Sequence, residues 1–389
     1  MKLEEIQSAI RAEGLDGWLF YDHHRRDPLA YRILGLPDVF PPTRRWYYFI
    51  PRDSNPQALC HRIEPNVLDS LPGEKHYYSR WAEQKNGIQS LLGKARTIAM
   101  QHSPECALPY IAMVDAGTID LVRSLGVAVQ SSANLVQLFE ARWTPIQLES
   151  HFEAGRRMDR IRVQAFELIR ERTRNGAAVS ELEVQTFLRQ RFKKEDLETD
   201  HGPIVAVNAN ASDPHYEPAE GKSIPIRRGD LVLVDMWAKL RTPGAVYYDI
   251  TWTAFCGDIP SPQMLAVFGT VAEARDTAVR FVADAIRHNT AIAGYQVDDV
   301  ARDHIEQAGF GRYFIHRTGH SIGTDVHGAG ANMDNFETHD ERRILPSTCF
   351  SIEPGIYLPN FGIRSEVNVF VSEQDARVTG DLQTEILAL

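Results

Sequence analysis

The stretch HRTGHSIGTDVH, residues 316–327, contains three of the chain's fourteen histidines: His316, His320 and His327. Gly319 and Gly323 interrupt it, which indicates a turn-rich strand or loop whose backbone comes close to another group. Neutral imidazole is a common metal ligand. For any one of these histidines a solvated loop is the better explanation, because single motif matches produce many false positives. The rest of the chain decides between a solvated loop and a metal site.

Four carboxylates in apolar stretches flank this motif, and we expect them on buried strands. They are Asp235 in LVLVDMW, Asp249 in YYDITWTAF, Glu353 in CFSIEPG and Glu366 in GIRSEVNVFV. Strand alternation places Thr251 on the face of Asp249, and Arg364 and Asn368 on the face of Glu366. One buried acid could form a salt bridge, but Arg364 could neutralise only one of the four. Four such acids need cations, and oxygen ligands with one imidazole favour Mn²⁺, Co²⁺ or Zn²⁺. Two ions would balance the charge, which predicts a two-metal site.

The acids also belong to a repeated pattern. A capping residue followed by proline predicts a helix start at Thr144 and again at Ser261, 117 residues later. Asp235 and Glu353 are 118 residues apart, and Asp249 and Glu366 are 117 apart. In each half, two predicted helices are followed by strands. The second part of the chain is therefore predicted to be a duplicated unit, with one acid from each of two successive strands in each half.

The first 140 residues alternate predicted helices and strands, beginning with a helix at 2–13 and a strand at 17–22. This pattern predicts a small α/β domain at 1–140, followed by a larger domain at 141–389. A polar cluster, His23, His24, Arg25 and Arg26, comes directly after the first strand. It is either a solvated turn or a loop that reaches the active site of a partner.

Composition narrows the class of protein. The 389 residues suit two domains, and 43% hydrophobic content supplies a sizeable core. A formal net charge of −10 disfavours nucleic acid and anionic membranes as partners. The N-terminus has no apolar secretion signal, no apolar run is long enough to span a membrane, and the four cysteines form no CxxC pair. We expect a cytoplasmic protein.

The ordered set Asp235, Asp249, His320, Glu353 and Glu366 resembles the metallopeptidase family that contains aminopeptidase P, prolidase and methionine aminopeptidase. The resemblance covers the chain from about residue 144 to its end. It implies a pita-bread catalytic domain, usually in a homodimer, that hydrolyses the peptide bond preceding proline. The first domain is similar to the N-terminal domain of the prolidase, aminopeptidase P and creatinase branch.

The resemblance also implies a role for each site residue. Asp249 and Glu366 would bridge two divalent ions, most simply Mn²⁺, while Asp235 would bind one ion and His320 with Glu353 the other. Water activated by the metals would attack the scissile carbonyl, and Glu353 would carry the proton to the leaving nitrogen. The remaining predicted residues act on the substrate. They are His215 on the substrate side, with His327 and His316 at the developing oxyanion. Apart from the resemblance, Arg364 is a candidate for binding the free carboxylate of a dipeptide substrate.

Several positions depart from the family pattern, and we expect them to alter the pocket wall. They are Trp252 for a common Arg, Ser321 for Gly, Gly328 for an acid, Val367 for Asp, and a longer connection between Asp235 and Asp249. Arg342 and Arg343 are either a surface pair or candidates for the free carboxylate of a dipeptide. A Xaa-Pro dipeptidase is the preferred interpretation and a Xaa-Pro aminopeptidase the alternative. A metal-free creatinase-type relative and a non-catalytic binding module remain further alternatives.

Overall fold

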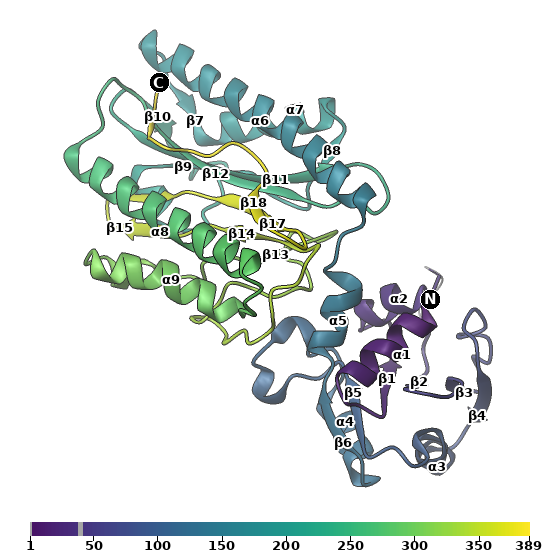
Figure 1. The fold of residues 1–389 in the computed structure, drawn as a ribbon. Helices are drawn as coiled ribbons and strands as arrows, with labels where there is room; N and C mark the ends of the chain where they lie inside the picture. Colours follow the sequence, from purple (N-terminus) through teal and green to yellow (C-terminus); the bar gives the residue numbers. More distant parts are fainter. Residues whose placement is uncertain (1, 38–41) are drawn as a thin grey trace. The chain divides into compact units, whose positions relative to one another are not determined.

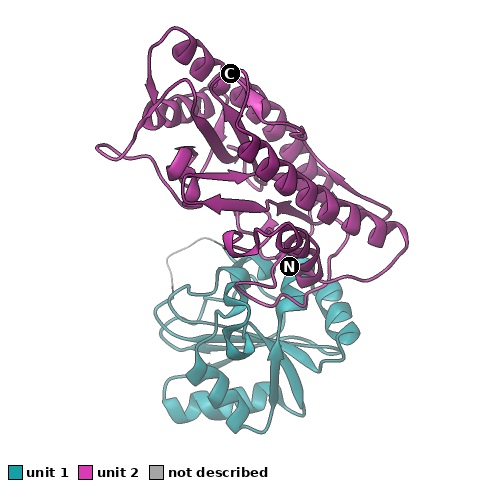
Figure 2. Ribbon diagram, turned by 90° about the vertical axis from the view of Figure 1, so that its left-hand side faces the viewer, with its two compact units in different colours: residues 1–140 teal, residues 141–389 magenta. Residues whose placement is uncertain are grey.

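The computed structural model describes residues 2–37 and 42–389 of the chain. It divides into two compact units, Met1–Glu140 and Ala141–Leu389 (Figure 2). In the described part of the chain, no helix combines the length and the apolar character needed to cross a membrane. The cysteines Cys60, Cys106, Cys256 and Cys349 are all free.

The first unit is a mixed sheet with helices. The strand order is β4-β3-β2-β1-β5-β6. The strands are β1 (Gly17–Asp22), β2 (Trp46–Pro51), β3 (Gln57–His61), β4 (Glu74–Tyr78), β5 (Thr97–Met100) and β6 (Ala128–Ser131). The helices are α1 (Leu3–Ala12), α2 (Pro28–Leu34), α3 (Trp81–Leu92), α4 (Ala116–Ser124) and α5 (Ala133–Glu140), with short 3-10 turns η1 (Pro104–Cys106) and η2 (Pro109–Ile111). Every residue of β1 is buried, as expected for a central strand with helices on its faces.

The second unit contains the duplication. Its first half comprises α6 (Pro145–Arg174), β7 (Val179–Ser180), α7 (Glu181–Lys194), β8 (Leu197–Glu198), β9 (Ile204–Val207), η3 (Asn208–Ser212), β10 (Pro225–Ile226), β11 (Leu231–Leu240) and β12 (Tyr248–Phe255). The second half comprises α8 (Pro262–Arg287), α9 (Gly294–Gln307), η4 (Gly311–Tyr313), β13 (Ser321–Ile322), β14 (Cys349–Ile352), β15 (Gly355–Leu358), β16 (Phe361–Arg364), β17 (Val367–Val371), β18 (Ala376–Val378) and β19 (Leu387–Ala388).

The two halves are built alike (Figure 1). Thr144 caps α6 and Ser261 caps α8, each with a side chain that accepts a backbone N–H of the first turn. Helix α6 packs on α7, β11 and β12, while α8 packs on α9, β14, β16 and β18. Each half thus carries a long helix pair on one side of its strands, and the strands are left to form the interior of the unit.

The halves meet where β12 approaches β17. The Asn368 side chain accepts the backbone N–H of Asp249 at 3.1 Å and donates to the Asp249 carbonyl at 2.8 Å. The Gln383 amide makes the corresponding pair of bonds to the backbone of Thr253, at 3.0 and 2.6 Å. Side-chain amides therefore take the place of ladder hydrogen bonds at this seam. Asn368 joins β12, which carries Asp249, to β17, which begins directly after Glu366.

The expectation that all four acids lie inside strands is right for Asp235 and Asp249 and wrong for the other two. Glu353 comes directly after β14, and Glu366 lies between β16 and β17. Pro354 has no N–H to continue the ladder beyond Glu353, so the chain leaves the sheet there and forms the β15–β16 hairpin. On its return, the Glu366 N–H donates to the Thr251 carbonyl of the other half.

A buried histidine in α6 makes the stability of the second unit depend on pH. His151 Nδ1 lies 2.7 Å from the Tyr247 carbonyl and Nε2 lies 2.7 Å from Thr379 Oγ1, an arrangement that suits the neutral ring. Burial lowers the pKa of His151 to about 4. Because its unfolded pKa is higher, the unfolded state binds the extra proton, and this contribution to stability is lost as pH falls from 6.5 towards 4.

We therefore expect His151→Asn to remove part of the acid sensitivity of the wild-type chain. Between pH 7 and pH 5 the difference in free energy of unfolding between wild type and variant should shrink by about 2 kcal/mol. Urea titrations at the two pH values measure this difference. His288→Asn, at an exposed histidine, is the control and should show no such change. An unchanged difference for His151→Asn would contradict the prediction.

Candidate functional site

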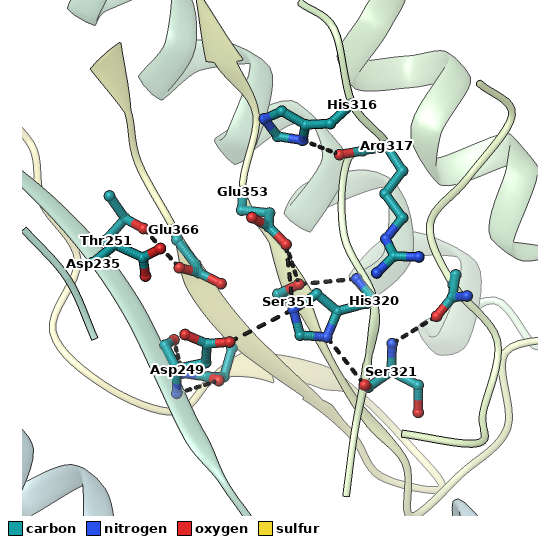
Figure 3. Close-up of polar contacts among 12 residues, drawn as sticks. Asp235, Asp249, Thr251, His316, Arg317, His320, Ser321, Ser351, Glu353 and Glu366 are labelled. Atoms are coloured by element: carbon teal, nitrogen blue, oxygen red, sulfur yellow. Dashed lines mark hydrogen bonds and ion pairs between the residues drawn. The ribbon is translucent and has the colours of Figure 1, made fainter. Parts of the chain in front are cut away.

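Three side chains from both halves converge on one buried point. The ligand atoms of Asp249, His320 and Glu366 all lie within 4.8 Å of one another, and all three residues are buried. Asp249 comes from β12, His320 directly precedes β13, and Glu366 directly precedes β17. Figure 3 shows these three side chains turned toward one another, with Glu353 beside them. The close approach of an imidazole and two carboxylates is the geometry of a metal site.

The backbone around His320 is fitted tightly to its neighbours. A Cβ on Gly319 would lie 1.9 Å from the Ser351 carbonyl oxygen, so only glycine allows this approach. The His320 N–H donates to Ser351 Oγ at 2.9 Å, and ring Nδ1 lies 3.1 Å from the Ser321 carbonyl. Nε2 lies 3.5 Å from Asp249 Oδ2 and 3.4 Å from Glu353 Oε1. Burial opposes protonation of the ring, but these two carboxylates raise the pKa of His320 in the metal-free site, and with Nδ1 as the donor Nε2 would be free to ligate a bound metal.

The electrostatics of the cluster also suit a cation. Burial, with repulsion from neighbouring acids, raises the pKa of Asp249 to about 7 and that of Glu366 well above its usual range. Among the described residues, no donor contacts Asp249 Oδ1 although this atom is buried. A buried carboxylate oxygen without a partner costs free energy unless a cation or proton satisfies it. The residues present therefore fit a divalent metal.

Asp235, on the strand next to that of Asp249, is bound by an arginine and not by the histidine of the cluster. It lies opposite Thr251 in the β11–β12 ladder, and its Oδ2 accepts a hydrogen bond from Arg364. Arg364 is buried and also donates to Thr251 Oγ1 at 3.0 Å, while Thr251 donates to Glu366 Oε2 at 2.8 Å. Arg364 thus holds Asp235, and through Thr251 it orients Glu366. These contacts disfavour the predicted role of Arg364 in binding a substrate carboxylate.

A hydrogen-bonded chain connects Arg364 to His316. Arg364 Nη1 donates to the Tyr357 hydroxyl at 3.1 Å, so this hydroxyl donates its own proton to His316 Nε2 at 2.7 Å. His316 Nδ1 then donates to the Arg317 carbonyl at 2.6 Å. Burial lowers the pKa of His316 to about 4, consistent with a neutral ring. Its ring nitrogens are therefore occupied, which disfavours the predicted role of His316 as a donor to an oxyanion.

The other predicted residues lie in different settings. The His327 ring is exposed and contacts the His320 ring edge-on, with centroids 4.4 Å apart. Glu353 is half-buried and accepts from Ser351 Oγ at 3.0 Å; burial opposes its ionisation, but His320, His316 and Arg364 together lower its pKa. His215 is exposed on the loop after η3, and no hydrogen bond or ion pair joins it to the described residues of the cluster.

Some of the expected changes to the pocket wall lie elsewhere. Trp252 lies on the face of β12 opposite to Asp249, where the Arg162 guanidinium is 3.6 Å from its ring centroid. Val367 packs in the core beneath α8. Ser321 does lie beside the metal cluster, because it directly follows His320, and its Oγ accepts the Gly330 N–H at 3.0 Å. Alternation along a strand sends adjacent residues to opposite faces, which explains the first two cases.

The surface-pair interpretation of Arg342 is wrong. Arg342 is 3% exposed and forms a two-pronged ion pair with Asp340, which is fully buried. Arg342 Nη1 also donates to the Ala329 carbonyl at 2.9 Å. Arg342 therefore stabilises the loop after His327, and its guanidinium is already paired. Arg343 is exposed.

Sequence reasoning missed two residues that contact the site, Ser351 and Tyr357. Ser351 contacts both His320 and Glu353, and Tyr357 joins Arg364 to His316. Ser351 could have been found from strand alternation, because it is two residues before Glu353. Tyr357 carried no comparable signal, since its contact depends on the β15–β16 hairpin.

Comparisons with known proteins identify a family of metal-dependent peptidases. The model of "Metallopeptidase family M24" matches residues 149–373. A putative Xaa-Pro aminopeptidase of Mycoplasma genitalium is 33% identical over 196 residues, which are 49% of this chain and 50% of that protein. A Xaa-Pro dipeptidase of Lactobacillus delbrueckii subsp. lactis is 28% identical over 94% of this chain and 93% of its own.

Solved structures share the fold along the whole chain. Dipeptidase PepE from Mycobacterium ulcerans superimposes with a TM-score of 0.73 at 24% identity, covering 100% of this chain and 96% of that chain. A prolidase from Thermococcus sibiricus gives a TM-score of 0.67 at 23% identity, covering 100% and 98%. The predicted fold class, an α/β N-terminal domain followed by a pita-bread domain, is confirmed.

Proposed function

Because this chain belongs to metallopeptidase family M24, we propose that it is a Xaa-Pro dipeptidase that hydrolyses the peptide bond preceding proline. The observation that carries this proposal is the buried Asp249, His320 and Glu366 cluster with its unsatisfied carboxylate oxygen. The intact cluster also argues against a metal-free relative and against a non-catalytic binding module, since neither requires acids to be buried together at this cost.

Asp235, Asp249, His320, Glu353 and Glu366 would hold two divalent metals, with Mn²⁺ favoured by the oxygen-rich ligands and Co²⁺ or Zn²⁺ as alternatives. When bound, the metals would polarise the scissile carbonyl and make water a nucleophile near neutral pH. Asp249 and Glu366 face each other from the two halves and are suited to bridge the ions. Asp235 would exchange part of its contact with Arg364 for a metal.

Glu353 is placed to move the proton. Its carboxylate is half-buried, its pKa is held low chiefly by His320 and by the guanidinium groups of Arg364 and Arg317, and Ser351 orients Oε1. It would accept a proton from the attacking water and return it to the proline nitrogen that leaves. His327 is exposed beside His320 and is suited to donate to the developing oxyanion. His215 would contact the substrate from its loop, while His316, Tyr357 and Arg364 position the acids.

The share of this chain that the curated relatives match favours a dipeptidase over the alternative, a Xaa-Pro aminopeptidase. The Lactobacillus dipeptidase matches along nearly the whole chain, including the first unit, whereas the Mycoplasma putative aminopeptidase matches about half of it. We further propose a homodimer, which the resemblance implies.

A comparison of two substrates tests the assignment. We expect kcat/KM for Ala-Pro with added Mn²⁺ to exceed that for Ala-Pro-Ala by about 100-fold or more, because a site built for a free proline carboxylate loses that contact with the longer peptide. A coupled assay for released proline and for released alanine measures both rates. The chelated enzyme is the control and should be inactive on both. Faster cleavage of the tripeptide would instead assign an aminopeptidase.

A further inference from the structure

The first unit contains a pocket of about 740 Å³ that the proposed peptidase function does not use. It lies where β1 ends and β2 begins, and helices α3 and α4 contribute to its wall. This volume falls in the range of small-molecule sites. Its lining includes His23 and Arg26, two members of the polar cluster that follows β1.

The wall of the pocket is strongly cationic. Arg26, Arg44 and Arg45 line it, and all three are exposed. Within residues 2–37 and 42–389, no carboxylate forms an ion pair with the guanidinium of Arg26 or Arg45. Arg44 lies near Glu64, whose carboxylate accepts the backbone N–H groups of Thr43 and Arg44. Of the three arginines in this wall, Arg26 and Arg45 therefore lie farthest from any carboxylate partner among the residues that the structure describes, while Arg44 has Glu64 beside its backbone.

The acid that lines the pocket does not offset this charge, because it is already engaged. Asp115 caps α4, where its two oxygens accept the Thr118 N–H and hydroxyl, each at 2.9 Å. This cap also occupies the helix N-terminus, so the anion-binding capacity lies in the arginines. Burial and the charges of His24, Arg26 and Arg45 lower the pKa of His23, which agrees with a positive potential on this wall.

The arginine loop is held in place by its own chain. The Asp22 carboxylate accepts the backbone N–H groups of Arg25, Arg26 and Asp27 at 2.8, 2.7 and 3.1 Å. On the other strand, the Arg45 carbonyl accepts the Tyr78 hydroxyl at 2.8 Å. Both cations therefore come from backbone segments with fixed hydrogen bonds, so a ligand would have to order only their side chains and not the loop.

An aromatic surface completes the pocket. Trp81, the first residue of α3, lines it and is 78% exposed. An indole in that position offers a face for stacking a planar group. Guanidinium groups match phosphate oxygens in a forked geometry, and two or more of them suit a multiply charged anion better than one carboxylate. The net charge of −10 disfavours a long polyanion, which would meet repulsion beyond the pocket.

We propose that this pocket binds a nucleoside phosphate, with Arg26 and Arg45 on the phosphates and Trp81 against the base. The test uses the full chain and ADP as the probe, with inorganic phosphate in parallel, by isothermal titration calorimetry. Arg26→Gln and Arg45→Gln should each weaken ADP binding about tenfold, and Trp81→Ala should weaken ADP but not phosphate. Arg96→Gln, at an exposed arginine by the start of β5, is the charge-matched control and should bind normally.

Each outcome decides the proposal. ADP should also raise the melting temperature of the wild-type chain and of Arg96→Gln, but not of the double variant Arg26→Gln/Arg45→Gln. Absence of ADP binding at millimolar concentration would overturn the proposal, as would binding that survives in the double variant. Phosphate binding as tightly as ADP, with no effect of Trp81→Ala, would overturn the assignment of a nucleoside. Circular dichroism of each variant separates lost binding from lost folding.

Discussion

Asp249→Asn should abolish turnover while leaving the fold intact. Asp249 contributes one oxygen to the buried cluster and has a second without a donor, so an amide there cannot replace both as metal ligands. We expect kcat/KM on a Xaa-Pro dipeptide to fall about 1000-fold or more, since the loss of metal-dependent transition-state stabilisation exceeds ~4 kcal/mol. The bound metal, measured by elemental analysis after dialysis, should fall in parallel.

The stability of the same variant separates loss of a ligand from loss of structure. Burial raises the pKa of Asp249 to about 7, so at pH 8 the metal-free wild type contains an ionised, buried carboxylate, which lowers its free energy of unfolding. The neutral amide removes that cost, and metal-free Asp249→Asn should be at least as stable as metal-free wild type. Asp159→Asn is the matched control, because burial also raises the pKa of Asp159, to about 6, away from the cluster. It should keep its metal and its activity. Normal turnover in Asp249→Asn would refute the ligand assignment.

The duplicated framework could be predicted from the sequence because its signals are local. Capping residues mark the starts of α6 and α8, and the repeated spacing of the acids marks matching strands. Apolar stretches around Asp235 and Asp249 identify β11 and β12. Such signals depend on neighbouring residues alone, so they survive without knowledge of the tertiary fold.

Features that depend on distant contacts could not be predicted in the same way. The engagement of Arg364 with Asp235 joins residues 129 positions apart, and the hydrogen bond of His316 to Tyr357 joins residues 41 positions apart. The sequence around Arg342, with two neighbouring acids, is typical of the surface, yet Arg342 and Asp340 are both buried and form an ion pair. A charged side chain is buried only where a specific partner is present, and pairing is a property of the folded chain.

Arg364→Met should strongly lower the free energy of unfolding of the metal-free protein. Arg364 is buried, holds Asp235 and donates to Thr251 and Tyr357, and the neighbouring negative charges raise its pKa well above the usual range. Removing one partner of a buried ion pair leaves the other unpaired, which costs about 3–5 kcal/mol. Urea unfolding of the chelated protein at pH 8 measures this cost. Activity should fall as well, because Thr251 and Glu366 lose their positioning partner.

Added Mn²⁺ should then stabilise Arg364→Met more than it stabilises wild type, by about 1 kcal/mol or more, because the variant site has lost a positive charge and has freed Asp235. Arg162→Met is the matched control. Arg162 is 5% exposed and pairs with Asp159 and Asp381 away from the metal site, so its loss should also destabilise the chain. The increment from Mn²⁺ in that variant should equal the wild-type value. An equal increment in Arg364→Met would mean that Asp235 and its arginine are independent of the metal site.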